Sequence, residues 1–148
     1  MASLLTLTFS QPTKALSAGD VLINEGDPGG DIYVLESGKL VVERDGVVIA
    51  TISEPGSLIG EMSVLLGKPN TATVRARDKA SVRVVRDAIA FLERQPLVTL
   101  RVATLLSERL DATSALLVEL KKEHGGKDDT SFFNRLMSAL LTHPTHAG

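Results

Sequence analysis

The stretch LIGEMSVLLGKPNTATVRA, residues 58–76, decides the fold of this 148-residue chain. Its first residues read as the end of a strand, Gly60 breaks that strand, and a single turn of helix begins at Glu61. Pro69 then opens a second strand, in which apolar and polar residues alternate. A glycine allows close approach to the backbone, and the first N–H groups of a helix lack partners within it. The stretch therefore predicts a small cradle for one anionic group.

The acid beside this cradle narrows the choice of anion. Glu61 would repel a phosphate unless its carboxylate accepts hydrogen bonds from the same ligand. The hydroxyl groups of a ribose supply such donors. The pair of features therefore points to the sugar-phosphate part of a nucleotide.

Short runs rich in Val, Ile and Leu, separated by glycines, surround this stretch and indicate antiparallel strands. The runs cover residues 21–23, 32–35, 39–44, 47–52, 71–76 and 81–86. Asp45-Gly46 lies between two of them and predicts a two-residue type I′ hairpin, because both residues tolerate a positive φ. We therefore expect an α+β, mainly β fold, with a β-roll over about residues 4–86.

The hydrophobic period changes after the strands. Asp87 is expected to cap a helix over residues 88–94, and Pro96 suits the first turn of a long helix over residues 97–124. Residues spaced by three and four along that helix form a coiled-coil seam. They are Ala103, Leu106, Leu110, Thr113, Leu117 and Leu120. This seam predicts a homodimer through Leu97–His124.

A glycine pair separates the domain over residues 1–124 from the segment 125–148. Gly125-Gly126 is expected to act as a linker to a short amphipathic helix, which Asp129 or Thr130 can cap. Its apolar side consists of Phe132, Phe133, Leu136, Met137, Leu140 and Leu141. This helix either docks on its own β-roll, which we favour, or offers a site for a partner. Residues 142–148 are expected to form a flexible tail.

Composition excludes several classes of function. Sixteen basic residues against eighteen acidic ones give a net charge of -2, which favours neither nucleic acid nor an anionic membrane as a partner. Cysteine is absent, and the histidines His124, His143 and His146 lie beyond the β-roll, so no metal site is expected inside it. Asp20, Asp27 and Asp31 stand among turn residues.

We therefore expect no enzyme activity, no catalytic residues and no cofactor. No stretch of about 18 apolar residues and no basic N-terminal region appears, so we expect a cytoplasmic protein.

The chain resembles the cyclic nucleotide-binding domain family, in particular the catabolite activator (Crp-Fnr-like) sensor domains, from about Phe9 to Glu123. The resemblance is carried by several motifs in order, namely Gly19–Asp27, Gly38, Gly60-Glu61-Met62 and Pro69–Val74. It implies an eight-stranded antiparallel β-roll, a cupin-like jelly roll, with flanking helices and a long C-terminal dimerisation helix.

The resemblance also implies a ligand site. Residues at the positions of Gly60, Glu61 and Met62 engage phosphate and ribose in the family, and Asn70, Thr71 and Ala72 stand at the entry of the following strand. The family carries there an arginine that pairs with the cyclic phosphate, and this chain has Asn70 instead. A charge-assisted hydrogen bond contributes about 1.5–3 kcal/mol, so without it binding is expected to be weaker by about ten- to a hundredfold or more.

Two features of the sequence imply different bases for the nucleotide. Arg109–Ser114 resembles the run on the dimer helix of the catabolite activators that reaches adenine, which implies that Thr113 and Ser114 read the base of cAMP. Thr71 instead matches a position at which members that prefer cGMP contact guanine. Either cyclic nucleotide therefore remains open as the ligand.

After the long helix, no recognition helix with a basic face can be assembled from the Phe132–Leu141 helix and the tail, so the helix-turn-helix domain of the family's transcription factors is not expected here. We therefore expect a stand-alone regulatory sensor of a 3′,5′-cyclic nucleotide that acts through an unknown effector protein. The alternative is a degenerate module that binds no nucleotide and serves protein interaction and dimerisation.

Overall fold

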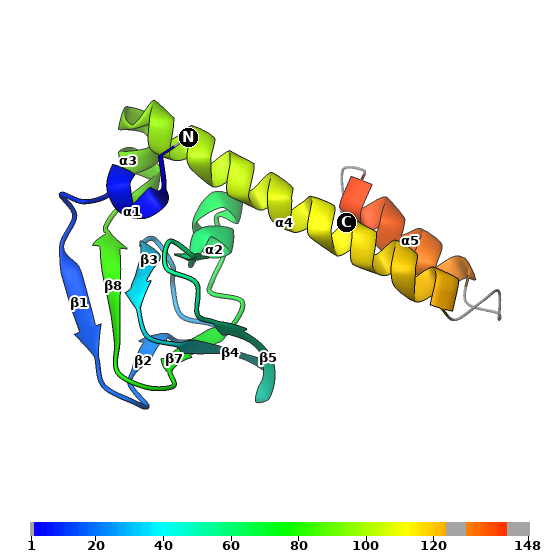
Figure 1. The fold of residues 1–148 in the computed structure, drawn as a ribbon, viewed down its shortest axis with the longest axis horizontal. Coiled ribbons are helices and arrows are strands. Elements are labelled where there is room, and N and C mark those ends of the chain that lie inside the picture. The colour runs from blue at the N-terminus through cyan, green and yellow to red at the C-terminus, as the bar shows by residue number, and fades with distance from the viewer. Residues whose placement is uncertain (1, 124–129, 142–148) are drawn as a thin grey trace. The chain divides into compact units, whose positions relative to one another are not determined.

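The computed structural model describes residues 2–123 and 130–141. Within these residues, eight antiparallel strands form two four-stranded sheets (Figure 1). One sheet has the order β1-β8-β3-β6 and the other the order β2-β7-β4-β5. The strands are β1 (Thr13–Leu16), β2 (Val21–Ile23), β3 (Ile32–Ser37), β4 (Leu40–Arg44), β5 (Val47–Ile52), β6 (Leu58–Ile59), β7 (Thr73–Ala76) and β8 (Ala80–Val85). The expected eight-stranded antiparallel roll is confirmed.

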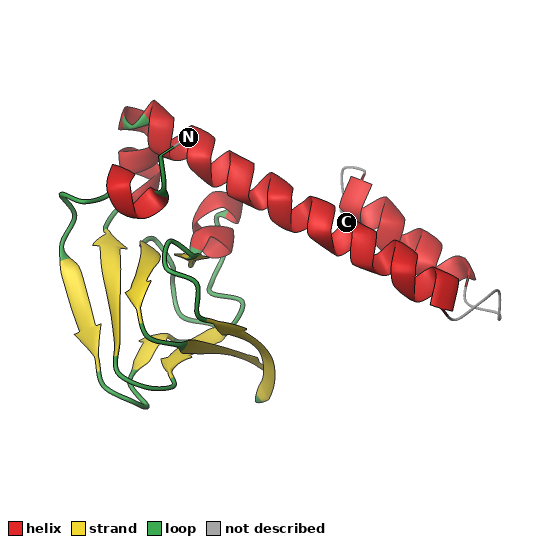
Figure 2. Cartoon of the chain, viewed as in Figure 1, coloured by secondary structure: helices red, strands yellow, loops and turns green. Residues whose placement is uncertain are grey.

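The described residues also form five helices, which Figure 2 draws in red beside the yellow strands. They are α1 (Leu4–Leu7), α2 (Glu61–Leu66), α3 (Ala88–Arg94), α4 (Pro96–Glu123) and α5 (Thr130–Leu141). The helix expected over residues 88–94 is confirmed. The long helix begins at Pro96, one residue earlier than expected. Its expected last residue, His124, lies outside the described residues, as do Gly125, Gly126 and the tail 142–148.

The β4–β5 hairpin confirms the turn expected at Asp45-Gly46. Both residues have a positive φ, 51° at Asp45 and 76° at Gly46, and Arg44 pairs with Val47 directly beside the turn, before the register shifts between Val42 and Glu43. β5 is also the last strand of its sheet. Its first three side chains are more than half exposed, at 61% for Val47, 59% for Val48 and 57% for Ile49.

The core lies between the two sheets. Alternating residues of the strands supply it, as the period of two predicts. The most deeply buried members are Leu35, Leu40 and Val82, each with no exposed surface. Apolar burial of this kind stabilises the roll by about 25 cal/mol per Å².

Two local expectations were wrong. The strand expected to begin at Thr71 begins at Thr73, because Thr71 and Ala72 form a bend directly after Asn70, which is hydrogen-bonded to the loop that joins β2 to β3. Asp87 precedes α3, but its side chain makes no capping hydrogen bond. Its φ is 47°, a left-handed conformation, and its N–H donates to Asp31 Oδ1 at 3.1 Å.

The described chain falls into two compact units. The first ends at Val102 and contains the roll, and the second contains the described residues from Ala103 onward. In the second unit, α5 presents one half-buried side formed by Phe133, Leu136, Met137 and Leu140. Among the described helices, none combines the length and the apolar character that a bilayer span requires.

Candidate functional site

The site expected from the sequence centres on Gly60, the residue between β6 and α2. Gly60 has a φ of 86°, a conformation that glycine adopts without strain. A Cβ atom at this position would lie 3.0 Å from the carbonyl oxygen of Asp31 and 3.3 Å from Cδ1 of Ile23. The last residue of β2, Ile23, and the last residue of the β2–β3 loop (residues 24–31), Asp31, therefore lie close to the start of α2. A side chain at this position would be strained by the positive φ and would require these neighbours to shift by a few tenths of an ångström.

Glu61, the first residue of α2, is buried. Only 5% of its surface is exposed, whereas its neighbour Met62 is 50% exposed. Burial of a carboxylate is costly unless it is hydrogen-bonded or paired. The expected acid therefore lies within the fold at the helix start instead of facing bulk water.

Asn70 faces the β2–β3 loop. Its N–H donates to the carbonyl oxygen of Asp27 at 2.9 Å, and its own carbonyl oxygen accepts from the N–H of Gly26 at 2.8 Å. Its side-chain Nδ2 donates to the carbonyl oxygen of Asn24 at 3.2 Å. Three residues of one loop thus contact Asn70.

Ser63 is a site residue that the sequence did not suggest. Only 5% of its surface is exposed, and its hydroxyl lies 3.1 Å from Oδ1 of Asn70 and 3.1 Å from the carbonyl oxygen of Gly60. A hydroxyl has one hydrogen, so the two oxygens share one donor. A serine inside a short helix has no distinctive sequence signal, and only the approach of Asn70 reveals its role.

The arginines after Asn70 point away from the interior, as the alternation along β7 predicts. Val74 and Ala76 are buried, with only 5% and 1% of their surface exposed. Arg75 lies 3.7 Å from Glu43 on the neighbouring strand, and 42% of its side chain is exposed. Arg77 is exposed. The charge that Asn70 lacks is therefore not replaced by either arginine in this arrangement.

Comparison with known protein families identifies the domain. The family model of the cyclic nucleotide-binding domain matches residues 13–92, which is more than half of the chain. The chain belongs to the cyclic nucleotide-binding domain family.

One protein with a similar sequence is much longer than this chain. An uncharacterized ABC transporter ATP-binding protein of Mycobacterium tuberculosis is 38% identical over 101 residues, which are 66% of this chain and 30% of that protein. The chain therefore spans less than a third of this curated relative.

Solved structures show the same domain. The catabolite activator protein of Thermus thermophilus superposes with a TM-score of 0.64 at 28% identity, covering 78% of this chain and 57% of that one. The cAMP-bound PfPKA-R fragment (141-441) superposes with a TM-score of 0.59 at 26% identity, covering 74% of this chain and 36% of that one.

The remaining expected site residues of this cyclic nucleotide-binding domain fall in two places. Thr71 and Ala72 are half-buried in the bend between Asn70 and β7. Thr113 and Ser114 lie on α4 in the second unit, where their hydroxyls donate to backbone carbonyl oxygens of the same helix, Arg109 at 2.8 Å and Asp111 at 2.9 Å. Their contact with a base stays a prediction.

Tyr33 lies beside Gly60 on β3. Its Cδ2 would be 3.8 Å from a Cβ atom at Gly60. Burial raises the pKa of the Tyr33 hydroxyl above its ordinary value, the negative charge of Asp31 raises it further, and Arg86 opposes both. Asp20 accepts a hydrogen bond from the N–H of Ser17 at 2.8 Å within a turn, whereas Asp31 accepts one from the N–H of Asp87, 56 residues away, just before α3.

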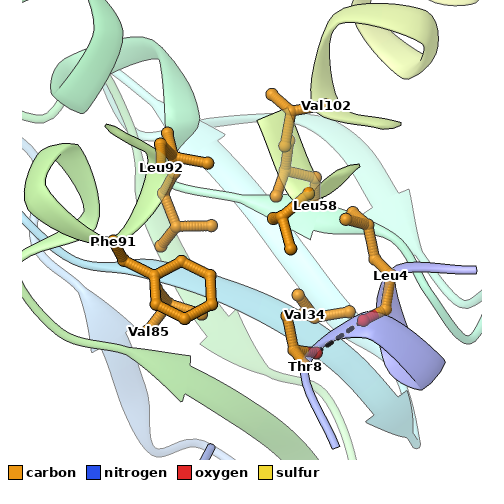
Figure 3. A pocket seen from close by; sticks show the side chains of 10 residues that line it. Leu4, Thr8, Val34, Leu58, Val85, Phe91, Leu92 and Val102 are labelled. Carbon is orange, nitrogen blue, oxygen red and sulfur yellow. Dashed lines mark hydrogen bonds between the residues drawn. The ribbon is translucent and has the colours of Figure 1, made fainter. Parts of the chain in front are cut away.

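The domain also contains an apolar pocket that is unsuited to a nucleotide. α1, α3 and the start of α4 line it together with β3, β6 and β8 (Figure 3). Its single polar side chain, Thr8, donates to the carbonyl oxygen of Leu4 at 2.6 Å. A phosphate would find no charged group there. Among the described residues, no cluster of His, Cys, Asp or Glu could hold a metal ion.

Proposed function

We propose that this chain is a regulatory sensor module that binds a 3′,5′-cyclic nucleotide, cAMP or cGMP, at the turn between β6 and α2. The observation that carries the proposal is the buried carboxylate of Glu61 directly after a left-handed glycine. An acid held within the fold at this point can accept hydrogen bonds from ribose hydroxyls. Gly60, Glu61, Met62, Asn70, Thr71 and Ala72 form the proposed site, and Thr113 and Ser114 are the proposed contacts of the base.

The affinity is expected to be modest. Asn70 offers neutral donors only, and one of them already serves Asn24. A neutral hydrogen bond contributes about 0.5–1.5 kcal/mol, against about 1.5–3 for one with a charged partner. Binding by this chain is therefore expected to be about tenfold weaker than that of a family member with arginine at this position.

Isothermal titration of the full chain with cAMP, cGMP and 5′-AMP tests the proposal. We expect heat and saturation with at least one cyclic nucleotide. Glu61→Gln should weaken that binding about tenfold or more, because it removes the charge that accepts the ribose hydroxyls. The exposed Glu54 provides a matched control, since Glu54→Gln makes the same chemical change away from α2. Equal affinities of the two variants would contradict the assigned role of Glu61.

One observation favours a second candidate function. Both polar atoms of the Asn70 side chain already have partners within the protein. A module that binds no nucleotide and acts through protein contacts would show this arrangement as well. Absence of heat and of a thermal shift at millimolar cAMP and cGMP would support this candidate, and tight binding created by Asn70→Arg would strengthen that conclusion.

The proposal includes a homodimer formed through α4 and an effector protein that receives the signal. The seam on α4 includes Leu106, half-buried within one chain, and Leu110, 42% exposed. We expect a second copy to cover such residues, with an effector protein receiving the signal. Sedimentation equilibrium with and without cyclic nucleotide measures the dimer and its response to the ligand.

A further inference from the structure

Asn70 is one of the residues that hold the β2–β3 loop, residues 24–31, in place; the N–H of Glu25 also donates to Thr73 Oγ1 at 3.0 Å, and the N–H of Ala88 donates to the carbonyl oxygen of Gly30 at 2.9 Å. Asn70 exchanges two backbone hydrogen bonds with the loop, one with Gly26 at 2.8 Å and one with Asp27 at 2.9 Å. These bonds need no particular side chain at position 70. They therefore fix the path of the backbone but do not explain why an asparagine stands there.

The Asn70 side chain adds two further bonds. Its Nδ2 donates to the carbonyl oxygen of Asn24, and its Oδ1 accepts from the hydroxyl of Ser63. The amide has only this orientation, because the reverse would place two oxygens with no hydrogen between them at the Asn24 carbonyl. The side chain thus joins α2 to the loop through neutral groups alone.

The loop backbone at Gly29 lies directly against Ser63 and Asn70. A Cβ atom at Gly29 would overlap the Ser63 hydroxyl and would come within 2.9 Å of Ser63 Cβ and 3.2 Å of Asn70 Oδ1. Its φ is not in the left-handed region, so close approach alone accounts for the glycine. The contact also explains why Ser63 is 95% buried.

We infer that Ser63 and Asn70 are positioning residues that hold the β2–β3 loop in place over the start of α2 without any ligand. The inference rests on the proposed function in one respect, that the start of α2 is the ligand site. All partners of this clasp, defined as Ser63, Asn70, Asn24 and Gly29, belong to the protein and are uncharged. The loop therefore takes its position before a phosphate arrives, and the site is preorganised.

Hydrogen exchange of the nucleotide-free full chain tests the clasp. Ser63→Ala removes the donor to Asn70, and Asn70→Asp keeps the shape but loses the donor to Asn24. Each variant should accelerate exchange in residues 24–31 about five- to tenfold, the effect of losing one hydrogen bond, with no change in β3 and β8. Matched controls are Ser107→Ala, which removes a hydroxyl bonded to its own helix, and Asn134→Asp, an exposed asparagine on α5.

A second measurement separates positioning from general stability. Ser63→Ala changes no charge, so it should weaken cAMP or cGMP binding through faster dissociation, with the rate of association unchanged. Unchanged loop exchange in both variants would overturn the inference even if the wild type binds a nucleotide. Accelerated exchange confined to residues 24–31 would support the clasp even if neither nucleotide binds, and in that case the proposed function alone would fail.

Discussion

The contact between Gly29 and Ser63 predicts that Gly29→Ala destabilises the wild-type protein but not the Ser63→Gly variant. Gly29→Ala places a methyl group against the Ser63 hydroxyl and 2.9 Å from Ser63 Cβ. Overpacking of this kind costs about 1–3 kcal/mol, while an alanine recovers about 0.4–1 kcal/mol by restricting the unfolded chain. The net loss in the wild type is therefore expected to be about 1–2 kcal/mol.

Ser63→Gly removes both atoms that would overlap. By itself it should cost about 1–2 kcal/mol, from glycine within a helix and from the lost hydrogen bond. Of the three atoms nearest to the new methyl group, that background keeps only Asn70 Oδ1, at 3.2 Å. Gly29→Ala should then be neutral or slightly stabilising, because the benefit in the unfolded chain remains and most of the overlap is gone.

Urea denaturation of the wild type, the two single variants and the double variant measures this cycle. We expect a coupling free energy of at least about 1 kcal/mol, in favour of the double variant. Gly19→Ala is the control, since its added Cβ meets nothing within 4 Å and only its φ of 89° opposes the change. Ser63→Gly should not rescue it. Additive effects within about 0.5 kcal/mol would refute the contact between the loop and α2.

Three further predictions use other parts of the structure. Asp31→Asn should lower the pKa of Tyr33, which alkaline difference absorbance can measure because the chain has a single tyrosine. Folding raises this pKa above its ordinary value of about 10, so Tyr33 contributes to stability at pH values below that ordinary pKa. This contribution is lost as the pH rises through the pKa of the folded state. Gly38→Ala should cost at least about 2 kcal/mol in thermal unfolding, because its Cβ would overlap the Lys79 carbonyl at a φ of 85°; an unchanged melting temperature would contradict this. Leu110→Lys should reduce dimer formation in sedimentation while leaving the melting temperature of dilute protein unchanged, and an undiminished dimer would place the interface elsewhere.

Local chemistry was sufficient to predict several elements. Asp45-Gly46 requires two positive φ angles, and the turn forms where the sequence places it. Gly60 and Glu61 predicted a strand, a break and a helix, and all three are present. Each of these features depends on residues adjacent in the chain, so the sequence alone contains the necessary information.

The errors and omissions involve contacts between distant segments. Asp87 has the residue type of a helix cap, but the bond from its N–H to Asp31, 56 residues away, accompanies a left-handed backbone that removes the cap. Ser63 resembles any polar helical residue until Asn70 and Gly29 approach it. Propensity cannot report such partners, because the fold brings them together.

The outer strand of the second sheet has a practical consequence. Residues 47–52 read VVIATI, without a charge or a proline, and β5 ends its sheet with its first three side chains largely exposed. Edge strands that carry neither a charge nor a proline tend to pair with a strand of a neighbouring molecule. Precipitation during concentration is therefore expected to begin here while the roll stays intact, and a lysine in place of Val48 should delay it.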